Sequence, residues 1–133
     1  MKTVLFVCVG NSGRSQMAEA FFNELARGRA KAVSAGTNPA QSVAPDVVQA
    51  MKEVGIDISN NRPKPLTEEM LAQADRMVTM GCGAEGVCPV SFVPTEDWAL
   101  EDPKGKSLEQ VRKIRDEIKA KVVKMLEDTE SNR

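Results

Sequence analysis

The residues best suited to catalysis lie in one stretch, Cys8-Val9-Gly10-Asn11-Ser12-Gly13-Arg14-Ser15. A cysteine thiolate is a strong nucleophile, and the guanidinium of Arg14 matches the geometry of a tetrahedral oxyanion. Gly10 and Gly13 let the backbone curl, so that its N–H groups can surround an anion. The stretch is therefore predicted to be a reactive loop, in which residues 9–14 bind an oxyanion and Cys8 attacks its central atom.

The flanking residues predict how this loop is positioned. The apolar run Val4-Leu5-Phe6-Val7 indicates a buried strand, and the pattern from about Ser15 to Ala26 indicates a helix. A helix that starts directly after the loop would direct the positive end of its dipole at the anion. Residues 8–15 match neither G-x-x-x-x-G-K-[ST] nor G-x-G-x-x-G, so this loop is not a nucleotide cradle of those kinds. The alternative interpretation of Cys8 is a small core residue at the end of a strand.

Length and charge limit the classes of protein to consider. The chain has 133 residues and a net charge of −1, which predicts a single domain over residues 1–133 and no affinity for nucleic acid or anionic membranes. No apolar run approaches the length of a membrane span. The N-terminal residues lead straight into the first strand, so no signal peptide is expected and the cytoplasm is the expected location. We also expect a monomer.

The chain contains no histidine and three cysteines, Cys8, Cys82 and Cys88. The lack of histidine excludes Cys–His and Ser–His–Asp catalysis. Three sulfurs without a C-x-x-C pair make a poor zinc site, so neither a metal nor a cofactor is expected. A permanent disulfide framework is also unexpected for an odd number of cysteines in a reducing compartment.

Further strands are expected at residues 31–36, 76–80 and 90–93, and further helices at 45–54, 67–74 and from Ser107 onward. Residues 95–105 are expected to be irregular, and residues 128–133 to be a frayed tail. This alternation predicts an α/β fold with a four-stranded parallel sheet in the order 2-1-3-4 and helices on both faces. Ligands bind such sheets at the carboxyl ends of the strands, where Cys8, Cys82 and Asp102 should therefore gather.

Two of these motifs together resemble a known family. Cys8-x5-Arg14-Ser15 after the first strand, with Asp102-Pro103 before the last helix, resembles the low-molecular-weight protein tyrosine phosphatase fold from Val4 to about Leu126. The resemblance implies that Asp102 is a general acid and that Ser15 donates to the Cys8 thiolate. Asn11 is expected to form hydrogen bonds that hold the loop. The alternatives are a turn or a helix lead-in for Asp102 and a helix cap for Ser15.

The two later cysteines resemble the thioredoxin-coupled arsenate reductase branch of that fold. A reductase must supply two electrons, which two thiols provide when they form a disulfide. The resemblance implies that Cys8 attacks arsenate, that Cys82 then releases arsenite by forming a Cys8–Cys82 disulfide, and that Cys88 forms a Cys82–Cys88 disulfide for thioredoxin to reduce. Glutathione or glutaredoxin is the alternative donor, and two spectator thiols are the alternative interpretation of the pair.

The main alternative function is a phosphatase, which needs only Cys8, the loop and Asp102. Phosphatases of this fold typically carry tyrosine after the Asp-Pro pair, whereas Lys104-Gly105 follows here and the chain has no tyrosine. This favours a small inorganic oxyanion, with phosphate or sulfate as analogues. A third possibility is a module that only binds oxyanions or senses redox state.

A potassium ion binds near the loop in some relatives of this fold. Asn11, Glu19 and Ser34 match three of its ligands, but Pro63-Lys64 stands where a carboxylate would be needed. A potassium site is therefore not predicted, and Glu19 is left as a possible helix-face charge.

Overall fold

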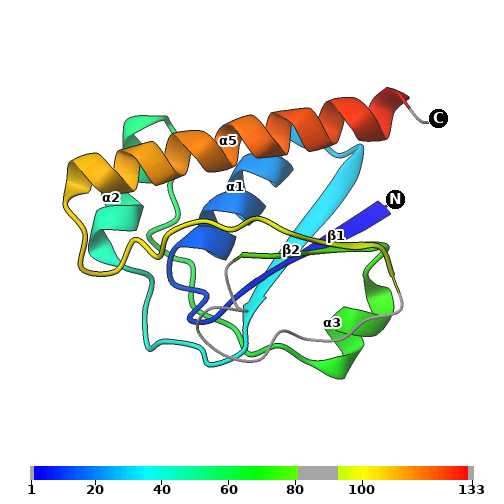
Figure 1. The fold of residues 1–133 in the computed structure, drawn as a ribbon, viewed down its shortest axis with the longest axis horizontal. Helices are drawn as coiled ribbons and strands as arrows, with labels where there is room; N and C mark the ends of the chain where they lie inside the picture. Colours follow the sequence, from blue (N-terminus) through cyan, green and yellow to red (C-terminus); the bar gives the residue numbers. More distant parts are fainter. Residues whose placement is uncertain (1, 81–92, 132–133) are drawn as a thin grey trace.

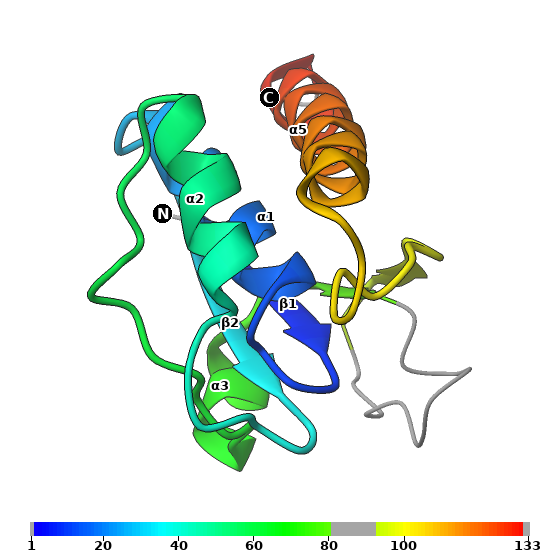
Figure 2. The same ribbon diagram turned by 90° about the vertical axis from the view of Figure 1, so that its left-hand side faces the viewer.

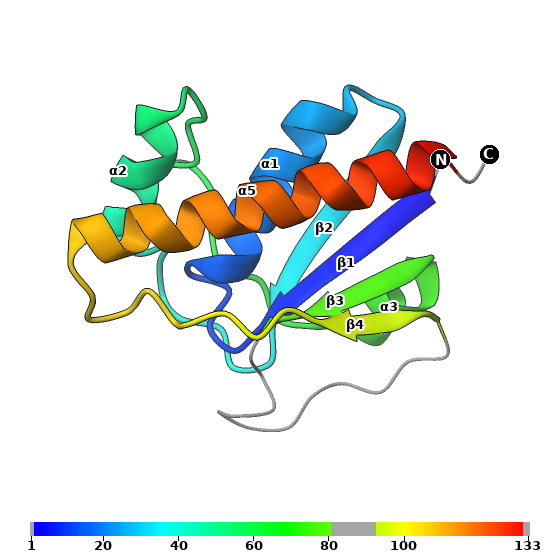
Figure 3. The ribbon, with the colours of Figure 1, turned by 45° about the horizontal axis from the view of Figure 1, so that its top comes forward.

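The computed structural model describes residues 2–131 except for residues 81–92. Its elements are β1 (Lys2–Cys8), α1 (Arg14–Ala26), β2 (Ala30–Gly36), α2 (Pro45–Glu53), α3 (Glu68–Gln73), β3 (Arg76–Thr79), β4 (Thr95–Asp97) and α5 (Leu108–Ser131). The strands form one parallel sheet in the order β2-β1-β3-β4 (Figure 3). The predicted fold class and strand order are confirmed.

Helices cover both faces of the sheet. Successive residues of β1 point to opposite faces and so belong to two different apolar clusters. Val4, Phe6 and Cys8 belong to a large cluster that includes residues of α1, α2 and α5. Leu5 and Val7 belong to a smaller cluster, against which residues of α3 pack. Figures 1 and 2 show the three larger helices on one side of the sheet and α3 on the other. An uninterrupted apolar strand is the expected sequence for this arrangement.

The last helix closes the larger cluster over β1. Its buried apolar side chains are those of Val111, Ile114, Ile118, Val122 and Met125. Ser107 accepts a hydrogen bond from the Gln110 N–H at 3.3 Å, and its own N–H donates to Gln110 Oε1 at 3.1 Å. These two hydrogen bonds form a capping box at the start of the helix.

The fourth strand is not where the sequence pattern predicts it. The predicted residues are 90–93, of which 90–92 lie outside the described residues, whereas β4 is Thr95–Asp97 and pairs with β3. It starts directly after Pro94, whose carbonyl accepts a hydrogen bond from the Met77 N–H at 3.0 Å. The pattern misses this strand because it is a polar Thr-Glu-Asp segment at the sheet edge. The expectation of irregular structure at residues 95–97 is therefore wrong.

The expected frayed tail is also wrong as far as the described backbone extends, because α5 continues to Ser131. Residues 106–131 contain neither glycine nor proline, so nothing in the sequence interrupts the helix. The other predicted elements lie within one or two residues of their predicted ends. None of the helices in the described ranges has the length and apolarity that a bilayer crossing requires.

Candidate active site

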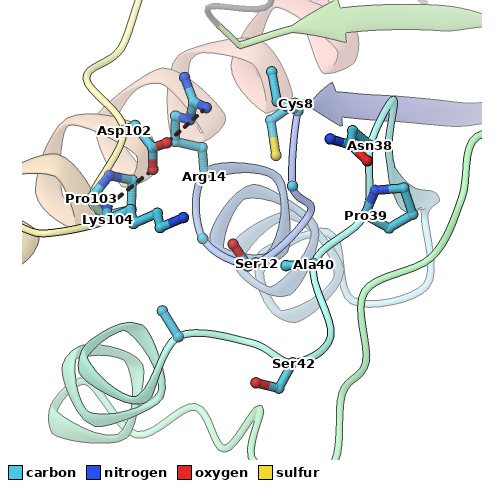
Figure 4. Close-up of a pocket in the computed structure, with 14 residues that line it drawn as sticks. Cys8, Ser12, Arg14, Asn38, Pro39, Ala40, Ser42, Asp102, Pro103 and Lys104 are labelled. Atoms are coloured by element: carbon cyan, nitrogen blue, oxygen red, sulfur yellow. Dashed lines mark hydrogen bonds and ion pairs between the residues drawn. The ribbon is translucent and has the colours of Figure 1, made fainter. Parts of the chain in front are cut away.

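A pocket of about 410 Å³ lies at the carboxyl end of β1, beside the start of α1 (Figure 4). Three segments that are distant in the sequence form its walls: the loop after β1, the segment after β2 and the segment before α5. The described lining residues are Cys8, Val9, Gly10, Ser12, Gly13, Arg14, Asn38, Pro39, Ala40, Ser42, Ala44, Asp102, Pro103 and Lys104. The predicted loop and Asp102 therefore meet in one cavity.

The backbone of the loop after β1 is oriented by hydrogen bonds from the neighbouring segment after β2, residues 37–44. Four carbonyl oxygens of the loop accept hydrogen bonds from N–H groups of residues 37–44. Residue 8 accepts from residue 37 at 3.1 Å, and residue 9 accepts from residue 38 at 2.8 Å. Residue 10 accepts from residue 40 at 2.9 Å, and residue 12 accepts from residue 44 at 3.0 Å. In a trans peptide, the next N–H points away from the carbonyl, so the N–H groups of residues 9, 10, 11 and 13 point away from that neighbour. One of them, from Asn11, donates to Cys8 Sγ at 3.2 Å. At Asn11, the side of the loop that carries these N–H groups therefore faces the sulfur.

Cys8 is a free thiol at the floor of this pocket, and its side chain is 2% exposed. Its Sγ lies 2.8 Å from the Oγ of Ser15, in the first turn of α1. Ser15 is not the cap of that helix, since Gly13 occupies the N-cap position without a side-chain hydrogen bond. Of the two roles considered for Ser15, contact with the sulfur is the one that the geometry supports.

Arg14 and Asp102 bring opposite charges together at the wall of the pocket. The Arg14 guanidinium is buried, and its Nη1 donates to the carbonyl of Leu100 at 3.3 Å. Its Nη2 lies 3.8 Å from Asp102 Oδ2, in a carboxylate side chain that is 42% exposed. Asp102 Oδ1 also accepts from the Lys104 N–H at 3.0 Å, so the turn considered as an alternative exists together with the pocket position (Figure 4).

Two glycines are required by close approaches around the loop. A Cβ at Gly13 would lie 2.6 Å from Pro103 Cγ, and a Cβ at Gly36 would lie 2.6 Å from the carbonyl oxygen of Val9. Gly36 pairs with Cys8 in the sheet, so its lack of a side chain makes room for the loop. The sequence analysis did not single out Gly36, because only the pairing of β1 with β2 shows why glycine is needed.

Asn11 lies fully buried within the loop, at a positive φ of 50°. Its Nδ2 donates to Ser15 Oγ at 2.7 Å and to Ser34 Oγ at 3.0 Å. Its Oδ1 accepts from Gln16 Nε2 at 3.1 Å and from the Lys64 N–H at 2.9 Å. All hydrogen-bonding positions of the amide are therefore used, which fixes its orientation. Gln16 was missed, because nothing local in the sequence distinguishes a buried glutamine.

Glu19 is not a simple helix-face charge. It accepts a short hydrogen bond from the Ser34 hydroxyl and forms an ion pair with Lys64, with Nζ 3.4 Å from Oε2. A lysine ammonium therefore stands beside the two oxygens that the sequence analysis compared with a potassium site. No cluster of three or more His, Cys, Asp or Glu side chains suited to a metal occurs in the described part of the chain.

Cys82 and Cys88 lie outside the described residues. The predicted gathering of cysteines at the carboxyl ends of the strands is therefore seen for Cys8 alone, together with Asp102.

Comparison with known proteins identifies the family. The family described as low molecular weight phosphotyrosine protein phosphatase matches residues 3–133. The chain belongs to this family. It is 41% identical over 131 residues to an arsenate reductase of Brevibacillus brevis, covering 97% of each chain.

Two solved structures extend this comparison of family members. A thioredoxin-dependent arsenate reductase of Corynebacterium glutamicum matches with a TM-score of 0.85 and 34% identity, covering all of this chain and 64% of the other. This chain thus spans just under two thirds of that protein. An arsenate reductase in a phosphate-binding state matches with a TM-score of 0.81 and 36% identity, covering 96% and 98% of the two chains.

Proposed function

We propose that this protein is an arsenate reductase that uses three cysteines and takes its electrons from thioredoxin. The observation that carries the proposal is the position of Cys8 Sγ, which lies in a pocket with Arg14 and accepts a hydrogen bond from the backbone N–H of Asn11. A tetrahedral anion in this pocket would meet donors on several sides and a nucleophile at its centre. The names of the relatives given above favour arsenate as that anion.

In the first step, the Cys8 thiolate attacks arsenic(V) and an arsenic–sulfur bond forms. One arsenic–oxygen bond breaks, and Asp102 donates the proton with which that oxygen leaves as water. Arg14 and the loop N–H groups stabilise the charge on the remaining oxygens. Ser15 donates a hydrogen bond to the thiolate before attack, at the 2.8 Å separation described above.

The redox steps involve Cys82 and Cys88. Cys82 attacks the Cys8 sulfur, so that a disulfide forms and the sulfur–arsenic bond breaks with its electron pair on arsenic. Arsenic(V) thereby becomes arsenic(III) and leaves as arsenite. Cys88 then attacks Cys82 and releases the Cys8 thiolate, and the thioredoxin dithiol supplies two electrons to the Cys82–Cys88 disulfide. One dithiol is oxidised for each arsenate, so the electrons balance.

The lining of the pocket supports an inorganic substrate over phosphotyrosine. Among the described lining residues there is no aromatic side chain, and the wall after β2 offers the short side chains of Asn38, Pro39, Ala40 and Ser42. Lys104 occupies the position after Asp102-Pro103 and adds a positive charge to the lining. Such a surface suits a small anion better than a phenyl ring, which binds best against aromatic and apolar groups.

A phosphatase is the second candidate, and one observation favours it. The described pocket alone holds a nucleophile, an anion-binding loop and an acid, which suffice to hydrolyse a phosphate ester. Weak ester hydrolysis would therefore fit either function.

The test is arsenite release in the presence of thioredoxin, thioredoxin reductase and NADPH. We expect turnover by the unmodified protein and none above background after Cys82→Ser or Cys88→Ser. One arsenate turnover without reductant should leave Cys88→Ser with a Cys8–Cys82 disulfide, detected by peptide mass mapping. Full turnover by Cys88→Ser would defeat the three-thiol sequence, and replacing thioredoxin with glutaredoxin tests the donor. Rapid phosphotyrosine-peptide hydrolysis that survives both replacements, without arsenite release, would establish the phosphatase instead.

A further inference from the structure

A chain of hydrogen bonds links a lysine near the surface to the sulfur of Cys8. Lys64 Nζ lies 3.4 Å from Glu19 Oε2, and the Ser34 hydroxyl donates to the same oxygen. Ser34 Oγ accepts from Asn11 Nδ2, which also donates to Ser15 Oγ. Ser15 Oγ in turn lies 2.8 Å from Cys8 Sγ. These residues come from β1, the loop after it, α1, β2 and the segment between α2 and α3.

The chemistry of the groups gives this chain a direction. The Glu19 carboxylate only accepts, so the Ser34 hydroxyl hydrogen must point toward it. The Nδ2 group of Asn11 only donates, so the oxygens of both serines accept from it. The hydroxyl hydrogen of Ser15 is then left for Cys8. The donor-only amide of Asn11 thus directs the Ser15 hydroxyl to the sulfur, which it stabilises as a thiolate, while Glu19 orients the Ser34 hydroxyl so that its oxygen can accept from the same amide.

A carboxylate at the far end also has a cost. The Glu19 side chain is 19% exposed, so water screens its charge only in part. A negative charge in this position would oppose the thiolate that the same chain stabilises. The ammonium of Lys64 offsets that charge, and it also lies 3.5 Å from Ser34 Oγ.

Lys64 is held in place by its backbone as well as by its ammonium. Its N–H donates to Asn11 Oδ1 at 2.9 Å, and its carbonyl accepts from the Gly36 N–H at 2.8 Å. The next residue, Pro65, forms a bridge with Gly36 beside the end of β2. The ammonium is therefore anchored to the same loop whose reactive sulfur it affects.

We propose that Glu19 and Lys64 are positioning residues for Cys8: Glu19 orients the Ser34 hydroxyl, whose oxygen holds the Asn11 amide, and Lys64 neutralises the charge of Glu19. Neither residue is among the described lining residues of the Cys8 pocket. The inference rests on the proposed function only in taking Cys8 as the nucleophile. Its test measures the reactivity of the Cys8 thiol without arsenate, so it can fail while arsenate reduction stands, and the reverse.

The experiment uses the full chain with Cys82→Ser and Cys88→Ser, which leaves Cys8 as the only cysteine. The rate of alkylation of Cys8 by iodoacetamide is measured as a function of pH. Lys64→Met should move the midpoint of this profile up by roughly half a pH unit or more, as removal of one nearby charge does in a partly buried site. Lys64→Arg keeps the charge and should stay close to the parent protein.

The decisive comparison is the double variant Lys64→Met with Glu19→Gln. Glutamine removes the unpaired charge and keeps an oxygen that accepts from Ser34, so the profile should return most of the way to that of the parent. Lys31→Met removes an exposed lysine from β2 and should leave the profile unchanged. All variants keep Arg14, Asp102 and Lys104, the charged residues that line the pocket with Cys8.

Three results would overturn the proposal. The Lys64→Met profile could coincide with that of the parent while the unfolding midpoint falls, which would indicate a purely structural ion pair. Lys31→Met could shift the profile as far as Lys64→Met does, which would indicate a general charge effect. The double variant could stay at the position of Lys64→Met, which would show that Lys64 does not act through Glu19. Should Lys64→Met fail to fold, Lys64→Gln provides the same comparison with a polar side chain.

Discussion

Cys8 Sγ and Ser15 Oγ lie 2.8 Å apart, although one residue ends a strand and the other lies in the first turn of a helix. The loop between them brings the start of α1 back beneath the end of β1. The sulfur thus receives a hydroxyl from the helix and the N–H of Asn11 from the loop. Both donors favour a negatively charged sulfur over a neutral thiol.

Replacing Ser15 with alanine should slow arsenate reduction by about 10-fold to 100-fold, because a hydrogen bond to a charged group contributes about 1.5–3 kcal/mol. Steady-state kinetics with thioredoxin present would measure the effect. Ser59→Ala, at an exposed serine before α3, serves as the control and should leave the rate unchanged. Equal rates for Ser15→Ala and the unmodified protein would show that the hydroxyl has no part in activating Cys8.

Replacing Gly36 with alanine should weaken oxyanion binding by about 10-fold or more. The new Cβ would lie 2.6 Å from the Val9 carbonyl oxygen and 3.1 Å from the Asn11 nitrogen, so the loop must shift. Displacements of about 1 Å can cost factors near 100 in a reactive site. Phosphate binding by titration calorimetry would report this loss.

Gly55→Ala provides a matched control for Gly36→Ala. Gly55 has a φ of 85° but open space where a Cβ would lie, so alanine there should lower stability through backbone strain alone. Phosphate affinity should therefore stay constant in Gly55→Ala while the unfolding temperature falls. If both variants lost affinity equally, reduced stability rather than loop geometry would explain the result.

Replacing Asp102 with asparagine should reduce the rate by about 100-fold or more, the usual contribution of a general acid. Phosphate binding should be retained or become tighter, because a negative charge 3.8 Å from Arg14 is removed. Single-turnover kinetics and calorimetry separate the two effects. A parallel loss of rate and affinity would instead assign Asp102 a role in holding Arg14.

The contact between α2 and α5 should respond to acid. Hydrogen bonds from Arg112 hold the pKa of Glu53 at about 2, below its ordinary value of 4.5. Since the pKa is lowered by folding, the stabilisation is complete above about pH 4.5 and is lost as the pH falls toward 2. Glu53→Gln should lower the unfolding temperature at pH 7 but make little difference near pH 2. A destabilisation that is constant over this range would contradict the assignment.

The parts of the site that are close in the sequence could be predicted from it. Cys8, Arg14 and Ser15 lie within one strand–loop–helix unit, so local rules for turns and helix starts place them together. Asp102 was placed at the same edge of the sheet by the predicted topology, and its role as an acid came from the resemblance to a family. Its distance of 3.8 Å from Arg14 emerges only when the segment before α5 folds across the end of the sheet.

The parts that depend on tertiary contact could not be predicted. Glu19 and Lys64 are 45 positions apart, and nothing in a single sequence pairs one lysine among many with one glutamate. The strand β4 was missed for a similar reason, because its polar residues show no burial and its identity comes from pairing with β3. Apolar periodicity in a sequence reveals surfaces that become buried. Neither the ion pair of Glu19 with Lys64 nor the polar strand β4 is a surface of that kind.

Four carbonyl groups of the loop after β1 are held by N–H groups of residues 37–44 of the same chain. Such a cradle recognises a tetrahedral shape and a negative charge, which arsenate shares with phosphate. If the proposed function is correct, the abundant phosphate of a cell must compete for the same pocket. Discrimination then occurs after capture, because thiols reduce arsenic(V) but not phosphorus(V).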